Sequence, residues 1–261
     1  MNTSWSLQNK KALVTGGTKG IGLAIVEEFV RLGAEVLLVA RNSKQVSDTV
    51  QLLTQRGFLV SGLAGDVSEG AFRKELIQVV ENKWGKLDIL VNNVGTNVRK
   101  KFVEYTEEEY RQLFETNLFS LTEITRMAFP LLKKSGKASV INMASVAGSV
   151  GISERFGYSM TKGAVLSMTY STALDYINHG IRCNSISPAR VHTPFVDAYL
   201  KKNYPGKEME VFDQLAKSQP IGRMGSPDEI ANLALFLCTD EAAFITGCDY
   251  PIDGGFIKLV P

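Results

Sequence analysis

Tyr158 and Lys162 stand four residues apart and are the pair in this sequence best suited to acid–base chemistry. Residues at this spacing share one face of a helix, so the two side chains can lie close together. A free phenol has a pKa of about 10, too high for a base at neutral pH. A neighbouring ammonium group favours the phenolate and lowers that pKa. The pair is therefore suited to give a proton to a carbonyl oxygen or take one from an alcohol.

Two further polar residues can serve the same reaction. Ser145 follows an apolar run and precedes Tyr158 by thirteen residues. Its hydroxyl can polarise the same carbonyl, as the donors of an oxyanion hole do. Asn117 falls inside a long predicted helix, where asparagine is unfavourable. We therefore expect Asn117 to have a special role, binding a water molecule that links to Lys162.

A glycine-rich segment, Thr15–Gly22, follows the first apolar run and precedes an amphipathic stretch. Gly16, Gly20 and Gly22 allow a tight turn and a close approach of the backbone to a pyrophosphate. The free N–H groups and the dipole at the start of the following helix favour the same anion. With a strand before it and a helix after it, the segment predicts a dinucleotide site. A purely structural glycine turn is the alternative.

The end of the second apolar run indicates which dinucleotide binds. An acidic residue here would hold both ribose hydroxyls and favour NAD, but Ala40 stands at this position and Arg41 follows it. The planar fork of arginine suits a 2′-phosphate, and Lys19 can reach the same region. The sequence therefore predicts NADP(H) in preference to NAD(H), with a merely solvated Arg41 as the alternative.

Two more segments follow apolar runs and can contact the same cofactor. The carboxylate of Asp66, followed by Val67, could accept the adenine amino group. The stretch Asn92–Gly95 could bring its backbone close to the ribose, with Asn93 or its neighbour holding the strand end together. Taken alone, each segment fits a simple strand-end turn equally well.

Short apolar runs alternate with amphipathic segments along the whole chain. This alternation predicts an α/β fold with a parallel sheet covered by helices on both faces. We expect one domain over residues 1–261, since no linker or repeat interrupts it. The polar stretch 194–219 carries Pro205-Gly206 and predicts two short helices that form a lid over the carboxyl edge of the sheet, a plain surface excursion being the alternative. The predicted strands cover residues 12–14, 36–40, 59–63, 89–91, 139–142 and 181–186. The longer predicted helices cover residues 21–32, 107–132, 158–178 and 228–237.

Composition argues against several other classes of protein. The net charge is +2, and the basic clusters, among them Arg99-Lys100-Lys101, fit solvated surface better than a nucleic-acid site. The three cysteines are widely spaced, so we expect neither a metal site nor a disulfide framework. No apolar segment is long enough for a signal peptide or a membrane span. These features predict a cytoplasmic protein that binds no nucleic acid, membrane or metal.

Taken together, these motifs resemble the short-chain dehydrogenase/reductase family over nearly the full length of the chain. The resemblance implies a three-layer, doubly wound Rossmann fold with a seven-stranded parallel sheet, and a homotetramer or homodimer. It implies a catalytic tetrad of Asn117, Ser145, Tyr158 and Lys162. It also implies that the cofactor is bound by Gly16, Thr18, Lys19, Gly20, Ile21, Gly22, Arg41, Asp66, Val67, Asn93, Gly95, Tyr158, Lys162, Val191 and Thr193.

The sequence also departs from the family pattern, after the sixth strand. The usual proline–glycine reads Pro188-Ala189, and Arg190 then places a cation near the reactive end of the cofactor. Together with Ser145 and Arg155, Arg190 is a candidate to bind substrate, which predicts a substrate with a negative or highly polar group. Pairing of either arginine with a structural carboxylate such as Glu154 is the alternative. The sequence assigns no role to His192.

Two sub-families are similar to different parts of the chain. The N-terminal third and Asn92–Lys100 are similar to tropinone reductase-like proteins, and the C-terminal third is similar to bacterial dehydrogenases of sugars and sugar acids. We therefore expect an NADP(H)-dependent enzyme that interconverts a small-molecule carbonyl and a secondary alcohol. An NAD(P)-dependent sugar or sugar-acid dehydrogenase is the alternative, and a non-catalytic dinucleotide sensor is a third hypothesis.

Overall fold

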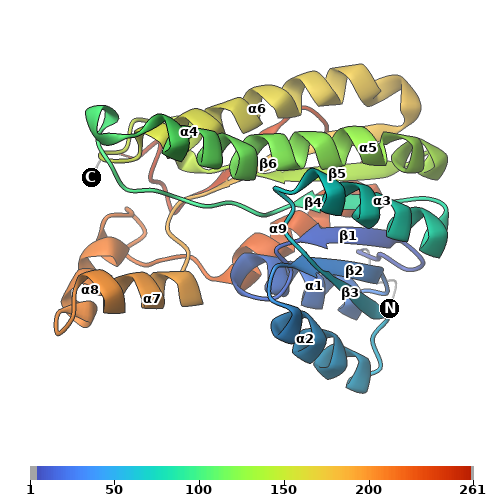
Figure 1. Ribbon diagram of the computed structural model, residues 1–261, viewed down its shortest axis with the longest axis horizontal. Helices are drawn as coiled ribbons and strands as arrows, with labels where there is room; N and C mark the ends of the chain where they lie inside the picture. The colour runs from blue at the N-terminus through green and yellow to red at the C-terminus, as the bar shows by residue number, and fades with distance from the viewer. Residues whose placement is uncertain (1–4, 260–261) are drawn as a thin grey trace.

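A sheet of seven parallel strands forms the centre of the computed structural model, which describes residues 5–259 (Figure 1). The strand order is β3-β2-β1-β4-β5-β6-β7, so the expected fold class is confirmed. Residues 1–4 and 260–261 of the expected domain lie outside the described residues. The strands are β1 Lys11–Thr15, β2 Glu35–Ala40, β3 Val60–Ala64, β4 Ile89–Asn92, β5 Ala138–Met143, β6 Ile181–Pro188 and β7 Asp249–Ile252.

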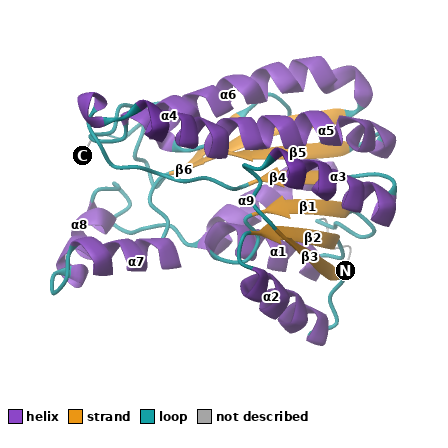
Figure 2. Cartoon of the chain, in the orientation of Figure 1, coloured by secondary structure: helices purple, strands orange, loops and turns teal. Residues whose placement is uncertain are grey.

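Helices pack on both faces of the sheet and make three layers (Figure 2). Residues such as Phe29 of α1 and Leu235 of α9 build the core on one face. Leu76 of α3 and Ile124 of α5 build the core on the other. The helices are α1 Gly20–Arg31, α2 Ser43–Gln55, α3 Gly70–Trp84, α4 Glu107–Phe114, α5 Ser120–Ser135, α6 Phe156–Tyr176, α7 Pro194–Asn203, α8 Glu208–Lys217 and α9 Pro227–Cys238.

The central strands are buried on both sides, which explains their composition. All four residues of β4 and all six of β5 are buried, so each strand needs apolar or hydrogen-bonded side chains on both faces. Asn92 meets this need at the end of β4, donating to Thr125 Oγ1 at 3.0 Å and to Asn142 Oδ1 at 2.9 Å. The strand ends that carry the candidate site are thus tied firmly together.

Chain order reverses between β1 and β4, which pair in parallel with Val14 opposite Val91. The connections that leave these two strands run to opposite sides of the sheet. A crevice therefore forms at their carboxyl ends, the usual position of a ligand in an open α/β sheet. The glycine-rich loop after β1 lies at this edge of the sheet. The stretch Asn92–Gly95, which includes the end of β4 and the start of the next loop, lies there too.

The long helix expected over 107–132 is interrupted. A wider, π-helical turn, Glu115–Phe119, joins α4 to α5. It contains Asn117, the residue whose helix-interior position was unfavourable. The expectation of one regular helix was therefore wrong at this point, because one extra residue is accommodated in the turn that carries Asn117.

Candidate active site

The glycine loop has the conformation that a close backbone approach requires. Gly16 and Gly20 have φ angles of 70° and 55°, a region that favours glycine. At Gly22 the φ angle is ordinary, but there is no room for a side chain, because a Cβ would lie 2.1 Å from the Gly16 carbonyl oxygen. The Gly16 N–H donates to the Val39 carbonyl at 2.7 Å, which anchors the loop to the end of β2.

Asn93 fixes the same loop from the other side. Its side-chain amide donates to the carbonyls of Thr15 at 3.0 Å and Gly16 at 3.3 Å. The methyl group of Thr193 would lie 3.3 Å from a Cβ on Gly20. The ends of β1 and β4 and the segment after β6 therefore meet at the glycine loop.

Tyr158 and Lys162 lie together in the first turns of α6. The Lys162 ammonium nitrogen is 5.7 Å from the centre of the Tyr158 ring and donates to the Met143 carbonyl at 2.6 Å. Lys162 is only 3% exposed, and burial lowers its pKa to about 8. The lysine is thus fixed between α6 and the end of β5.

The pKa of Tyr158 differs from the sequence expectation. Burial raises it, while a hydrogen bond with Ser145 and the charge of Arg155 act in the opposite direction. The expectation that the pKa of Tyr158 is lowered was therefore wrong for the protein without cofactor, because the loss of solvation outweighs the effect of neighbouring charges. The phenol keeps its proton at neutral pH, which suits a proton donor better than a base.

Asn117 is fully buried and does not contact Lys162 directly. Its Oδ1 accepts from the Thr96 N–H at 2.7 Å, and its Nδ2 donates to the Thr96 carbonyl at 2.8 Å and to Thr161 Oγ1 at 3.1 Å. A Cβ on Gly95 would lie 3.4 Å from Lys162 Nζ and 3.7 Å from Asn117 Oδ1. Asn117 thus connects α6 with the loop after β4, close to the lysine. Its expected water-mediated link to Lys162 stays a prediction.

One continuous cleft of about 1230 Å³ runs past these groups. Most of the expected site residues line it. Gly16, Thr18, Gly20, Gly22 and Asn117 do not line it. The expected residues that line the cleft are Lys19, Ile21, Arg41, Asp66, Val67, Asn93, Gly95, Ser145, Arg155, Tyr158, Lys162, Arg190, Val191 and Thr193.

Arg41 and Lys19 lie at the glycine-loop end of this cleft, and both are exposed. The Arg41 side chain is 81% exposed, with one guanidinium nitrogen 3.7 Å from Asp66 Oδ2. The other oxygen of Asp66 accepts from the N–H and the hydroxyl of Ser68 at 2.9 and 2.8 Å. These bonds make a turn after β3, so Asp66 offers one of its two oxygens to the cleft.

Arg155 and Arg190 line the same cleft as Tyr158. The alternative that Glu154 neutralises Arg155 was wrong, because Arg155 donates only to the backbone carbonyl of Glu154, at 3.2 Å. The Glu154 carboxylate pairs instead with Arg99 at 2.5 Å. Arg190 donates through Nε to Ser218 Oγ at 2.8 Å. Within residues 5–259, neither Arg155 nor Arg190 has a carboxylate within 4.0 Å.

The stretch 194–219 forms two helices, α7 and α8, in orange in Figure 1. Phe195 and Tyr199 of α7 and Leu215 of α8 line the cleft. His192 pairs with Asp197 at 2.8 Å and does not line the cleft. The histidine therefore holds the start of α7.

Sequence reasoning overlooked Arg99, which was assigned to solvated surface. The residue is half-exposed, yet it donates to the hydroxyls of Tyr199 at 2.9 Å and Tyr204 at 3.0 Å as well as to Glu154. It thereby ties the loop after β4 to α7 and to the segment before α6. The only sequence signal was its place four residues after Gly95, the last residue of the predicted strand-end turn.

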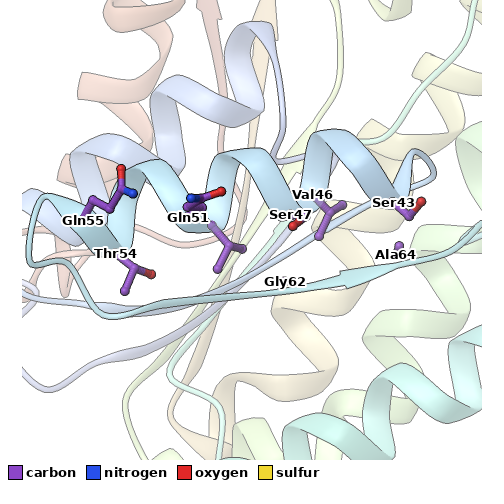
Figure 3. A pocket seen from close by; sticks show the side chains of 9 residues that line it. Ser43, Val46, Ser47, Gln51, Thr54, Gln55, Gly62 and Ala64 are labelled. Atoms are coloured by element: carbon purple, nitrogen blue, oxygen red, sulfur yellow. The ribbon is translucent and has the colours of Figure 1, made fainter.

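A second groove lies between α2 and β3 (Figure 3). It is lined by hydroxyl, amide and small apolar side chains, and none of its nine residues carries a charge: Ser43, Val46, Ser47, Val50, Gln51, Thr54, Gln55, Gly62 and Ala64. We therefore place the chemistry in the larger cleft. Across residues 5–259, no group of three His, Cys, Asp or Glu side chains could hold a metal ion. No helix in this range is long and apolar enough to cross a bilayer.

Comparisons with known proteins agree with this geometry. A family model described as enoyl-(acyl carrier protein) reductase, one of the short-chain dehydrogenases/reductases, matches residues 16–257. A tropinone reductase homolog from Arabidopsis thaliana is 41% identical over 253 residues, which cover 97% of this chain and 94% of that protein.

Solved structures extend the comparison to enzymes of sugars. L-sorbose reductase from Gluconobacter frateurii, complexed with NADPH and L-sorbose, matches with a TM-score of 0.95 at 29% identity, covering 99% of this chain and 100% of that one. Aldohexose dehydrogenase from Thermoplasma acidophilum matches with a TM-score of 0.89 at 30% identity, covering 98% of each chain. Both groups of relatives expected from the sequence are thus among the matches.

Proposed function

Because the chain belongs to the short-chain dehydrogenase/reductase family, we propose that it is an NADP(H)-dependent reductase of small-molecule carbonyl compounds. One observation carries the proposal: a single cleft runs from the glycine loop to the Tyr158 hydroxyl. A dinucleotide site and a proton donor thus share one cavity. A non-catalytic sensor would need only the first.

The residues at the glycine-loop end fit a dinucleotide. Gly22 packs against Gly16 in this loop without an intervening side chain. The N-terminus of α1 offers free N–H groups to a pyrophosphate. Lys19 and Arg41 supply two cations where a 2′-phosphate would lie, with Asp66 beside Arg41. When bound, the nicotinamide supplies the hydride, and the protein handles the proton.

At the other end, Tyr158 donates the proton. Its raised pKa keeps the phenol protonated at neutral pH, so the hydroxyl can protonate a carbonyl oxygen as negative charge develops there. Ser145 adds a second hydroxyl to the same oxygen. Lys162, held by the Met143 carbonyl, places a positive charge behind the phenol and stabilises the phenolate left after transfer. These roles favour reduction at neutral pH.

A second candidate function is oxidation of a sugar or sugar acid with NAD(P). The similarity to L-sorbose reductase and aldohexose dehydrogenase favours it. In either case α7 and α8 act as a lid over the substrate, since their side chains line the cleft. We further propose a homodimer or homotetramer in the cytoplasm. A panel of ketones with NADPH, run against sugars with NAD(P), discriminates the two functions.

The Tyr158→Phe variant tests the proposed chemistry. Removal of the phenolic hydroxyl should lower kcat for ketone reduction by roughly 100- to 10,000-fold, the usual contribution of a general acid. NADPH affinity should remain within about threefold, because the ring is retained. Tyr170→Phe, an exposed tyrosine of the same helix, is the matched control. Near-normal turnover in folded Tyr158→Phe would remove Tyr158 from the mechanism.

A further inference from the structure

The charges that line the cleft do not balance. Four carboxylates line it, and within residues 5–259 each of them already has a cationic partner. The pairs are Asp66 with Arg41, Glu109 with Lys100, Glu115 with Arg73, and Glu154 with Arg99. No carboxylate of the cleft is left for Arg155 or Arg190, the two arginines near Tyr158.

The Arg190 side chain and backbone are held in place by hydrogen bonds to the segment after α8. Its Nε donates to Ser218 Oγ at 2.8 Å, and its backbone N–H donates to Gln219 Oε1 at 2.9 Å. Gln219 is itself fixed, donating to the Arg223 carbonyl at 2.6 Å. The two terminal nitrogens of the Arg190 guanidinium have no hydrogen-bond acceptor within residues 5–259. A half-buried fork with free donors is suited to a planar oxoanion.

Arg155 approaches the same space from the start of α6. It directly precedes the helix and follows Glu154, whose φ of 57° is unusual for a residue with a side chain. One terminal nitrogen donates to the Glu154 carbonyl, and the rest of the guanidinium has no acceptor in the described chain. Arg155, Tyr158 and Arg190 line the same cleft, and burial together with the charge of Arg155 lowers the pKa of Arg190.

We propose that Arg155 and Arg190 form a carboxylate-binding subsite, and that the substrate is a ketone or secondary alcohol that bears a carboxylate. The inference rests on the proposed function of the cleft. Two cations that repel each other within a half-buried cavity are stabilised when an anion lies between them. An anchored carboxylate would also hold the carbonyl in a fixed position relative to Tyr158. Lys19 and Arg41 remain at the glycine-loop end.

A set of ring ketones of different charge tests the subsite. The probes are 4-oxocyclohexanecarboxylate, its neutral primary amide and the permanently cationic 1,1-dimethyl-4-oxopiperidinium, each with NADPH. The wild-type enzyme should prefer the carboxylate to the amide in kcat/KM by about 10- to 100-fold, the range that one hydrogen bond to a charged group supplies. The cationic ketone should be the poorest substrate.

Arg190→Met and Arg155→Met should each reduce the ratio of kcat/KM for the carboxylate to that for the amide to within about threefold. Arg190→Lys should restore part of it, since lysine keeps the charge but not the fork. Arg31→Met is the matched control, because Arg31 pairs with Glu28 at the far end of α1. Affinity for NADPH, measured by fluorescence, should stay unchanged in Arg190→Met.

Binding of cyclohexanecarboxylate to the enzyme–NADPH complex, measured by calorimetry, gives a readout that needs no turnover. Its Kd should rise at least tenfold in Arg190→Met. If the carboxylate and amide are reduced equally well and the variants leave that ratio unchanged, the subsite is refuted and the proposed function stands. If Arg190→Met weakens NADPH alone, the arginine serves the cofactor and the subsite is again refuted. If no ketone is reduced but cyclohexanecarboxylate binds through Arg190, the subsite stands and the proposed function fails.

Discussion

Replacing Gly22 by alanine tests how the glycine loop shapes the cofactor site. Gly22 lies in the first turn of α1, where alanine alone would stabilise the helix by about 1 kcal/mol. The added Cβ, however, would lie 2.1 Å from the Gly16 carbonyl oxygen and 2.6 Å from the Asn93 amide nitrogen. Real Cβ contacts are not closer than 3.0 Å. The Gly16 carbonyl oxygen must therefore move away by at least 0.9 Å, the difference between 3.0 and 2.1 Å.

The steric effect should exceed the gain in helix propensity. Overpacking of this kind costs about 1–3 kcal/mol, so Gly22→Ala should lower the free energy of unfolding by about 1–2 kcal/mol. The displaced Gly16 carbonyl belongs to the loop that we propose receives the pyrophosphate of the cofactor. Because a misplacement of about 1 Å can cost a factor of about 100, the Kd for NADPH should rise at least tenfold. Fluorescence titration and thermal unfolding followed by circular dichroism measure the two effects.

Gly70→Ala is the matched control for this substitution. Gly70 begins α3, and the nearest atom to a Cβ there is Arg73 Nη2 at 3.7 Å. This variant should be as stable as the wild type or slightly more so, with unchanged NADPH affinity. A Gly22→Ala protein with wild-type stability and wild-type Kd would refute the reasoning, since it would mean that the close approach to Gly16 has no role in binding.

Two shorter predictions concern cofactor choice and pH. Arg41→Ser should reduce the ratio of kcat/KM for NADPH to that for NADH by about 10- to 100-fold. The control, Arg56→Ser, removes an arginine that pairs with Glu27 of α1 from the C-terminal end of α2 and should leave the ratio unchanged. An unaltered ratio in Arg41→Ser would contradict the assignment. The pH profile of reduction should be flat near neutrality and fall as pH rises through about 8, because Lys162 loses its charge there while Tyr158, with its raised pKa, still holds its proton. A profile that stays flat to pH 9.5 would show that the Lys162 charge does not assist the phenol.

Much of the fold follows from local patterns in the sequence. The buried strands are recognisable in the sequence as runs of apolar residues. The sequence analysis placed six of the seven strands within about two residues at each end. Helices α2 and α3 were not among the expected helices. In α2 only Val46 and Leu53 are buried along thirteen residues, so the apolar stripe that reveals a helix is thin. Asn42 caps the start of the helix and stabilises it, its side chain accepting from the Gln45 N–H at 2.9 Å.

The glycine loop and the Tyr158–Lys162 pair were predictable for the same reason, since each motif is contiguous or spans one helical turn. The turn around Asn117 was not. Its geometry depends on the loop after β4, where Thr96 lies 21 residues away and exchanges two hydrogen bonds with the asparagine. A π-helical turn of this kind is stabilised by tertiary contacts and leaves only a weak trace in local sequence.

Charge pairing around Arg155 could not be predicted at all. The sequence places Glu154 beside Arg155, and proximity along the chain suggests that the two neutralise each other. In the fold, the left-handed conformation of Glu154 is accompanied by pairing of its carboxylate with Arg99, 55 residues away. Arg99 is in turn fixed by Tyr199 and Tyr204. The same arrangement that ties down α7 therefore leaves Arg155 without a carboxylate partner among residues 5–259, and the unpaired cation in the cleft is a consequence of how α7 is attached.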